Sequence, residues 1–280
     1  MYRLVFVVMA SALLMTACRG RQAAAPAEAD VEPTDTPATA MTYADSLEQL
    51  ITETPMPRAA DELFDDFLFN FAANRKLQME RVAYPLTVVR NGDTTLIEKG
   101  QWQMDHFFMR QDYYTVLFDD EQQMEVVKDT AVSQATVEKI YFNTKAVIQY
   151  YFSRIKGAWM LIGQKTEPMA ANRNGDFLEF YHRFVTDTLF QTQSLNETVT
   201  FVGPDPDDDF AQMEGILTPD TWPAFAPELP DRMMYNIVYG KPAADTGRKV
   251  FVMRGIANGL EVEMTFAKKD GKWRLMKMVN

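Results

Sequence analysis

The stretch "GLEVEMTFAKKDGKWRLMKMV" at residues 259–279 alternates apolar and polar side chains, is interrupted by an Asp-Gly pair, and then alternates again. Alternation with a period of two is the pattern of a strand with one buried face, and Asp-Gly is a preferred turn between paired strands. The stretch therefore predicts an antiparallel hairpin. The segment "RKVFVMRGI", which begins at Arg248, predicts one more strand before it.

This hairpin has an earlier counterpart in "AVIQYYFSRIKGAWMLIGQK" at residues 146–165. The two stretches share aromatic, glycine and aliphatic positions 114 residues apart: Phe152, Gly157, Trp159 and Leu161 match Phe266, Gly271, Trp273 and Leu275, and Ile148 and Tyr150 match Val262 and Met264. A coincidence between two aromatic-rich segments is the alternative. Matches at both ends of the repeat in nearly one register favour two copies of one domain.

The front of each copy predicts a helix. "LFDDFLFNFAANRKLQ" at residues 63–78 lies over "DFLEFYHRFVTDTLFQ" at residues 176–191, 113 positions later. In the second segment, Phe177, Phe180, Tyr181 and Phe184 are spaced i, i+3, i+4 and i+7, which is one apolar helix face. Each copy then reads as a long N-terminal helix packed on a curved antiparallel sheet, an α+β domain. We expect one such cone-like domain over residues 58–168 and a second over 169–280.

An opening aromatic helix, an irregular middle segment and closing strands that end in Gly-x-Trp resemble the nuclear-transport-factor-2-like (NTF2-like, cystatin-like cone) fold. Two such copies behind a lipoprotein signal resemble an uncharacterised family of exported lipoproteins from Gram-negative gut anaerobes. The resemblance covers residues 58–280, and it rests on structural aromatic positions. It implies a fold and no single activity, because this superfamily holds dehydratases, isomerases, binding modules and assembly factors.

The first residues of the chain predict that the protein is exported and where it is localised. Arg3 precedes an apolar run of about twelve residues, which is too short to span a bilayer. Leu14 to Ala17 precede Cys18, the one cysteine of the chain, and resemble a lipoprotein box. We expect a signal peptide over residues 1–17 and a lipid on Cys18, with an ordinary cleaved signal as the alternative. Lipidation would anchor the protein in the membrane of the cell envelope, on the periplasmic face of the outer membrane by default.

Residues 18–57 are rich in Ala, Pro, Thr and acidic residues and poor in aromatic ones. Such a composition buries too little apolar surface to offset the entropy of ordering, so the segment reads as a flexible tether. Ser46 in this tether stands in an Asp-Ser-Leu triplet that resembles an O-glycosylation acceptor. The net charge of the whole chain is −11, which argues against a nucleic-acid partner.

The chain offers few groups for catalysis. His106 and His182 are its two histidines, so a site of clustered His and Cys is excluded and we expect no metal. The acidic segment "VGPDPDDDF" at residues 202–210 leaves calcium as an alternative, against a simple acidic turn. Neither a Gly-x-Ser-x-Gly nucleophile motif nor a glycine-rich phosphate loop is present, and we expect no cofactor.

The resemblance implies where chemistry would sit, since cone-fold enzymes use an interior Asp or His–Asp pair with a Tyr. The residues that could supply it are Asp105, His106, Asp112, Tyr113 and Tyr114 in the first copy, and Tyr181, His182, Asp187 and Tyr235 in the second. Aromatic residues near the expected cone mouths could instead line a ligand pocket. The predicted ligand-binding set is Trp102, His106, Phe108, Tyr113, Trp222, Phe225 and Tyr235.

Three functions remain open from the sequence. The leading hypothesis is a lipid-anchored envelope protein that binds a small ligand or a protein partner without catalysis. The second is a dehydratase or isomerase, which an interior Asp–His or Asp–Tyr pair near 3 Å would favour. The third is a structural envelope component whose cones are filled by their own side chains.

Overall fold

The computed structural model describes residues 61–280 except 206–207 and 242–245, and the side chains of 208–210 are also left aside. The expected signal peptide, the lipidated Cys18, the tether and Ser46 therefore lie outside the described residues. Within the described part, none of the helices is long and apolar enough to cross a membrane. The same residues hold no cluster of three or more His, Cys, Asp or Glu side chains fit for a metal ion.

The helices differ from the expected pair of long ones. Each predicted helix is two short ones: α2 (Phe64–Ala73) and α3 (Arg75–Arg81), then α4 (Gly175–Thr186) and α5 (Thr188–Gln193). The division falls at Asn74 and Asp187, 113 residues apart, where the backbone is extended. The side chain of each caps the following helix, because it accepts a hydrogen bond from the backbone N–H three residues on.

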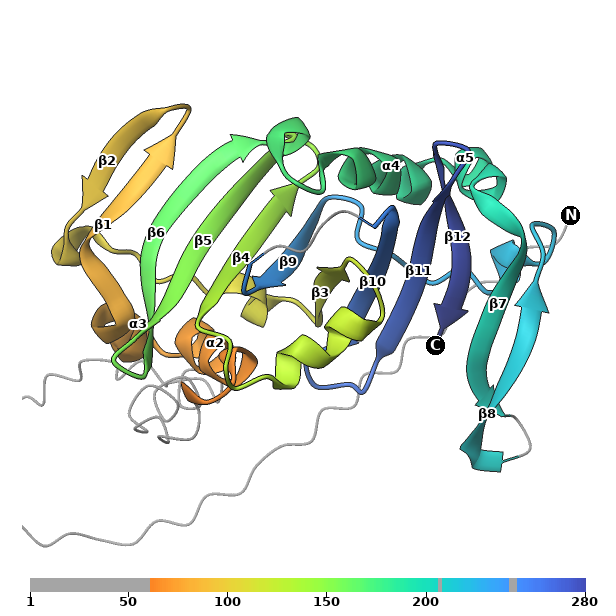
Figure 1. The fold of residues 1–280 in the computed structure, drawn as a ribbon, viewed down its shortest axis with the longest axis horizontal. Helices are drawn as coiled ribbons and strands as arrows, with labels where there is room; N and C mark the ends of the chain where they lie inside the picture. Colours follow the sequence, from red (N-terminus) through yellow and green to blue (C-terminus); the bar gives the residue numbers. More distant parts are fainter. Residues whose placement is uncertain (1–60, 206–207, 242–245) are drawn as a thin grey trace, which may run out of the picture. The chain divides into compact units, whose positions relative to one another are not determined.

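Two six-stranded sheets make up the rest of the fold (Figure 1). The first sheet has the order β2-β1-β6-β5-β4-β9, and the second has the order β3-β10-β11-β12-β7-β8. The strands of the first sheet are β1 (Val82–Arg90), β2 (Asp93–Ile97), β4 (Gln134–Tyr141), β5 (Ala146–Ile155), β6 (Ala158–Pro168) and β9 (Met233–Tyr239). Those of the second are β3 (Tyr113–Phe118), β7 (Leu195–Asp205), β8 (Asp208–Leu217), β10 (Arg248–Gly255), β11 (Glu261–Lys269) and β12 (Lys272–Val279).

The strand pairings of the first sheet correspond to those of the second. The strand after each helix pair runs parallel to the last strand of its half, β1 to β6 and β7 to β12, and the other pairings are antiparallel. The predicted hairpins are confirmed as β5–β6 and β11–β12, in which Phe152 faces Leu161 and Phe266 faces Leu275. The fold is therefore a mixed α+β structure of two curved sheets and few helices, as the sequence predicts at that level.

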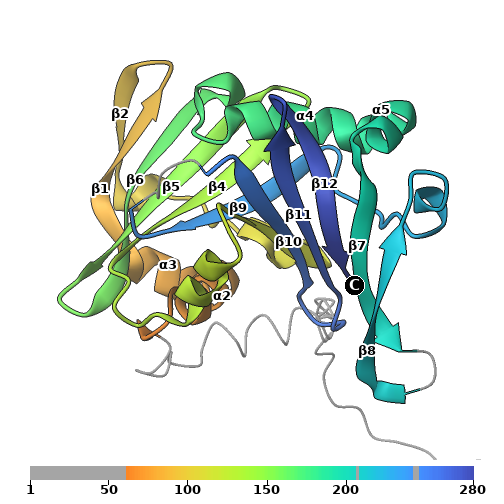
Figure 2. The same ribbon diagram turned by 45° about the vertical axis from the view of Figure 1, so that its right-hand side comes forward.

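One strand of each sheet comes from the other half of the chain. β9 pairs with β4, whereas β3 pairs with β10 (Figures 1 and 2). The exchanged strands also bond to each other, since Asn236 Oδ1 accepts from Leu117 N at 2.8 Å and Thr115 Oγ1 accepts from Tyr235 N at 3.0 Å. Each sheet therefore needs residues from both halves, and the domain boundary between residues 168 and 169 stays a prediction.

The helices cover the sheets through the predicted aromatic faces. In the first half, Phe64 contacts Trp159 with ring centroids 4.8 Å apart; in the second, Phe177 contacts Trp273 at 5.1 Å. A second contact also occurs twice: Trp102 Nε1 donates to Gln78 Oε1 at 3.2 Å, and Trp222 Nε1 donates to Gln191 Oε1 at 3.0 Å. Equal contacts thus hold the segment after β2 and the segment after β8 onto their helices.

Candidate functional site

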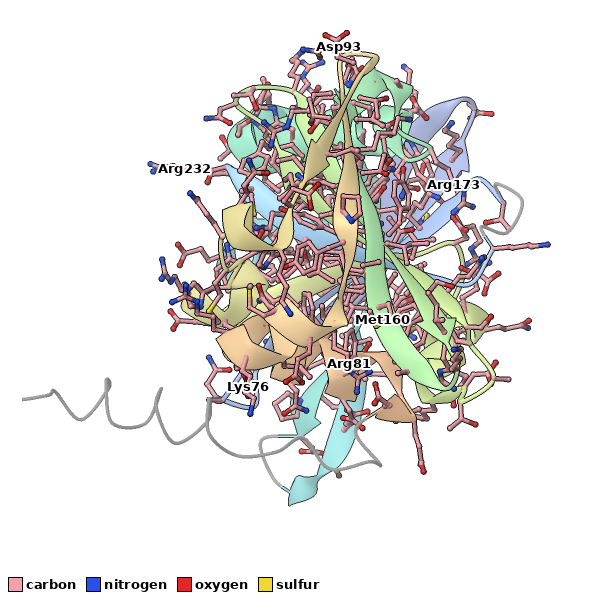
Figure 3. The ribbon with its side chains drawn as sticks, turned by 90° about the vertical axis from the view of Figure 1, so that its left-hand side faces the viewer. Lys76, Arg81, Asp93, Met160, Arg173 and Arg232 are labelled. Carbon is pink, nitrogen blue, oxygen red and sulfur yellow. The ribbon has the colours of Figure 1, made fainter. Side chains whose placement is uncertain are left out.

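A cavity of about 480 Å³ opens in the first half, where the segment between β2 and β3 approaches the first sheet. That segment includes two short 3-10 helices, η2 (Lys99–Gln101) and η3 (Phe107–Arg110). The cavity is lined by Arg90, Ile97, Gln101, Trp102, Gln103, Met104, Asp105, His106, Phe107, Arg110, Tyr150 and Gln164. Figure 3 views the β1–β2 edge of this sheet, with Asp93 at the tip of the hairpin and Arg81 at the other end of β1.

Asp105 is the centre of a hydrogen-bonded network at the base of this cavity. The ammonium group of Lys139, from β4, lies 2.6 Å from Oδ1 and 2.7 Å from Oδ2 of the carboxylate. The hydroxyl of Tyr150, from β5, donates to Oδ2 at 2.7 Å, and the backbone N–H of Phe107 donates to Oδ1 at 2.8 Å. Two strands of the sheet and the loop itself thus fix the position of the carboxylate.

These contacts set the protonation state of the site. Burial by itself would raise the pKa of Asp105, but the charge and hydrogen bonds of Lys139, with those of Phe107 and Tyr150, hold that pKa below its ordinary value. Burial first, and then the negative charge of Asp105, raise the pKa of Tyr150 well above that of an ordinary tyrosine. Asp105 is therefore a carboxylate and Tyr150 a neutral phenol over the ordinary range of pH.

Aromatic rings surround the ammonium group of Lys139. Its nitrogen lies 5.1 Å from the ring centroid of Phe107, 5.4 Å from that of Tyr150 and 5.8 Å from that of Tyr235. These distances allow cation–π attraction, which is stronger in a site with little water. Tyr235 stands on the exchanged strand β9, so the second half of the chain contributes to the site of the first half.

The carboxylate of Asp105 has no free place for another donor. An ionised carboxylate offers about four lone-pair positions, and Lys139, Tyr150 and the Phe107 N–H occupy two on each oxygen. A carboxylate with a lowered pKa and occupied lone pairs is a poor base. The arrangement can therefore position and bind a ligand more readily than it can remove a proton from one.

The predicted ligand-binding residues fall in several places. Trp102 and His106 line the cavity, and the ring of Tyr235 lies 5.8 Å from the ammonium nitrogen of Lys139. Phe108 is fully buried and packs against Phe69 and Tyr114 at centroid distances of 5.0 and 5.2 Å.

Of the other three predicted residues, Trp222 and Phe225 belong to the second half, and Tyr113 stands on β3, the strand that the first half contributes to the second sheet. Trp222 is buried and bonded to Gln191, and Tyr113 packs against the core cluster of the second sheet. Phe225 is half exposed and packs against Phe201 at 5.4 Å. His182, the remaining histidine, stacks on Phe142 at 5.0 Å. The structure therefore brings Trp102, His106 and Tyr235 to one site and places the others elsewhere.

Among the residues of the site that sequence reasoning did not single out are Lys139, Tyr150, Gln164, Arg90 and Arg110. Lys139 had a detectable pattern, because in "TVEKIYF" it shares its strand face with the buried Val137. A lysine on the apolar face of a strand indicates a buried partner for its charge. Its partner Asp105 lies 34 residues earlier, on an irregular segment, so no local pattern identifies the pair.

The second half carries apolar side chains at the corresponding strand positions. The register that pairs Lys139 with Ile148 and Tyr150 with Gln164 recurs 114 residues later, pairing Met253 with Val262 and Met264 with Met278. Asp105 stands three residues after Trp102, and Phe225 stands three residues after Trp222. Lys139, Tyr150, Gln164 and Asp105 thus correspond to Met253, Met264, Met278 and Phe225. The polar network belongs to the first half.

A second cavity, of about 400 Å³, lies on the opposite face of the first sheet, beside Gln149, Tyr151 and Ile162. Glu138, the acidic residue that lines it, has its carboxylate occupied by protein donors. The Glu138 carboxylate accepts from the side-chain amides of Gln149, Asn172 and Asn236 at 2.9, 2.7 and 2.8 Å. These bonds join β4, the turn after β6 and β9, which indicates a structural role for Glu138.

Comparison with known proteins places the chain in a family. Residues 43–280 match a family described as a domain of unknown function (DUF4348), and the chain belongs to that family. The matched range spans both halves. The chain is also similar to a crystal structure of an NTF2-like protein, BF2862, from Bacteroides fragilis NCTC 9343. The two share 41% sequence identity with a TM-score of 0.73, over 80% of this chain and 98% of that one. No curated protein matches the chain.

The similarity to BF2862 confirms the NTF2-like fold expected from the aromatic helix faces and closing hairpins. A cone of this class is a ligand-binding or enzyme-like module. The cavity above Asp105 is the part of this chain that fits either role.

Proposed function

We propose that this protein is a binding protein, whose first-half cavity takes up a small ligand reversibly and without catalysis. One observation carries the proposal: the Asp105 carboxylate stands at the base of a 480 Å³ cavity with its lone pairs occupied by protein donors. The volume lies within the roughly 300–1,000 Å³ of typical small-molecule sites. The occupied network fixes one wall of the cavity, and Trp102 and Phe107 give a ligand aromatic contact surface.

One observation favours a second candidate, an enzyme of the isomerase or dehydratase type. The Tyr150 hydroxyl and Asp105 Oδ2 form an interior Asp–Tyr pair at 2.7 Å. The ion pair with Lys139 weighs against it, since a general base works best when its pKa lies near the operating pH. A direct test is the exchange of the α-protons of phenylacetone in deuterium oxide. We expect the wild-type protein and Asp105→Asn to give equal rates; a faster rate with the wild type would favour the enzyme.

We also propose that the two halves are tandem NTF2-like units with different roles. Support comes from features that recur in both: the helix caps at Asn74 and Asp187, and the Trp–Gln bonds of Trp102 and Trp222. The first unit binds the ligand. The second, with Met and Phe at the corresponding positions, supplies β9 and Tyr235 and acts as a scaffold.

We further propose that a lipid on Cys18 holds the protein at the cell envelope, with residues 18–57 as a tether. The support is the signal-like residues 1–17 that end in "LLMTA" before Cys18. Growth with an alkyne-tagged palmitate should label the wild-type protein and leave Cys18→Ser unlabelled and released from the membrane fraction. Equal labelling of the two proteins would contradict this anchor.

The binding proposal is tested on the full chain carrying ¹³C-methyl methionine. Met104 lines the cavity, whereas Met253, Met264 and Met278 stand at the corresponding second-half strand positions and serve as internal controls. Met104→Leu assigns the reporter resonance. We expect members of a general fragment library to move the Met104 resonance saturably and to leave the three control methyls in place. A library that leaves Met104 unmoved would contradict the proposal.

A further inference from the structure

The groups of this cavity that remain free for a ligand include two guanidinium groups and one side-chain amide. Gln164 is buried on β6, and its side-chain amide makes no hydrogen bond with the residues that the structure describes. Arg90 and Arg110 also line the cavity, and within the described part of the chain neither guanidinium pairs with a carboxylate. The chain as a whole has a net charge of −11. Two arginines without a carboxylate partner therefore make the charge near this cavity opposite in sign to that of the whole chain.

The one acidic side chain that lines the cavity does not offset these arginines. Lys139 neutralises Asp105, and the Asp105 lone pairs are occupied as described above. The Trp102 N–H is also engaged, since it donates to Gln78. A ligand that enters therefore meets free cationic donors and no free carboxylate, which favours a ligand that carries a negative charge.

The sheet register places these groups on one face. A row across five strands runs through Tyr235, Lys139, Ile148, Thr166 and Arg90, each paired with the next. Three strand spacings separate Lys139 from Arg90, or roughly 14 Å. Gln164 occupies the neighbouring row on the same face, two residues before Thr166. The donors thus surround a space about the length of a small organic molecule.

The rest of the lining has an apolar part beside the polar side chains of Gln101, Gln103 and His106. Ile97, Trp102, Met104 and Phe107 make up this apolar part. A small inorganic ion would leave these surfaces in contact with water. A ligand with an aromatic or aliphatic body and one anionic end would cover them and reach a guanidinium at the same time.

We infer that the ligand of this cavity is an organic oxyanion, a carboxylate or phosphate ester with an apolar body, bound by Arg90, Arg110 and the Gln164 amide. The inference rests on the proposed binding function and specifies its ligand class. Arginine provides the planar double donor that both carboxylate and phosphate oxygens fit.

The test compares four probes that share a phenyl ring, on the full chain with ¹³C-methyl methionine. Phenylacetate and phenyl phosphate are anionic, phenylacetamide is neutral, and phenethylamine is cationic. We expect the two anions to move Met104 at concentrations roughly tenfold lower than the amide, and the amine to bind least. The ratio between phenylacetate and phenyl phosphate then distinguishes the two sources of oxyanion.

Each outcome of this panel is decisive. Preferred binding of the amide or the amine at Met104 would overturn the anion inference and leave the binding proposal intact. A Met104 resonance unmoved by all four probes and by the fragment library would overturn both.

Matched variants assign the effect to the named residues. Arg90→Gln and Arg110→Gln should each weaken phenylacetate binding by roughly tenfold and leave phenylacetamide binding nearly unchanged. Arg248→Gln is the control, because Arg248 is an exposed arginine of β10 in the second sheet. An equal loss in all three variants, or no loss in the first two, would overturn the assignment.

Discussion

The ammonium nitrogen of Lys139 lies 2.6 Å from Asp105 Oδ1 and closes an ion pair between residues 34 positions apart. The corresponding positions of the second half hold Met253 and Phe225, so this fold forms its sheet without such a pair. Buried ion pairs contribute little to stability compared with packed apolar residues. The presence of the pair in one half alone therefore favours a role in the cavity above it.

Removal of one partner of this pair should be costly. Lys139→Met leaves the Asp105 carboxylate buried without its counter-ion, which we expect to lower the free energy of unfolding by about 3–5 kcal/mol. The double variant Lys139→Met with Asp105→Asn carries no unpaired charge and should recover most of that loss. Urea denaturation of the full chain measures both. Lys272→Met, on an exposed position of β12, is the control; a double variant as unstable as the single one would contradict the argument.

The same pair makes stability depend on pH in a defined direction. The pKa of Asp105 is below its ordinary value of 3.8 in the folded protein, so the unfolded chain takes up the proton first as the pH falls. The stabilisation is fully present above that ordinary value and is lost as the pH falls through the lower folded pKa. Asp119 and Asp176 have lowered pKa values as well, so they contribute in the same direction.

The contribution of Asp105 is therefore measured as the difference in free energy of unfolding between two proteins. The free energy of unfolding of the wild type minus that of Asp105→Asn should shrink on acidification below about pH 4. A difference that stays constant or grows over that range would show that Asp105 is not held as a carboxylate in the folded protein.

Strand exchange predicts that neither half folds by itself. Residues 58–168 lack β9, and residues 169–280 lack β3, so each fragment loses the edge strand of its sheet and the bonds that join Asn236 to Leu117. We expect each fragment alone to be unfolded or aggregated, and the two expressed together to form a one-to-one complex. Size-exclusion chromatography and methyl spectra check this outcome. A monomeric fragment that unfolds cooperatively would contradict it.

The helix faces and hairpins could be predicted because their signals are local. Phe177 and Phe184 repeat with the helical period, and Asp270-Gly271 marks the turn between two alternating segments. The exchange of β3 and β9 could not, because alternation identifies which face of a strand is buried and not which strand it pairs with. Trp102 and His106 were found through their aromatic neighbourhood, whereas the pairing of Lys139 with Asp105 could not be, because the two residues lie 34 positions apart. The split of each long helix was not predicted. Its physical cause is the side chains of Asn74 and Asp187, which compete with the helical backbone for hydrogen bonds.

The two caps should contribute equally to stability. Asn74→Ala and Asp187→Ala each remove an acceptor for a backbone N–H, so each should lower the free energy of unfolding by about 1 kcal/mol. Asp187→Asn keeps a capping acceptor and should stay within a few tenths of a kcal/mol of the wild type. Thermal unfolding followed by circular dichroism compares the three variants. A loss in Asp187→Asn as large as that in Asp187→Ala would assign the effect to the charge and not to the cap.

A substitution at Gln164 should change ligand binding with little effect on the stability of the fold. Its side-chain amide makes no hydrogen bond with the described residues, and the second half holds Met278 at the corresponding position, so Gln164→Met fits the fold and removes no internal bond. We expect the free energy of unfolding to stay within about 1 kcal/mol of the wild type, because the substitution breaks no internal hydrogen bond and the amide faces the cavity. Phenylacetate binding should weaken because the oxyanion loses a donor. Titrations followed at Met104, with urea denaturation of the same sample, measure both quantities. If the variant binds phenylacetate as tightly as the wild type, Gln164 takes no part in the site. If the variant is less stable than the wild type by more than this margin, the Gln164 amide has a partner in the folded protein.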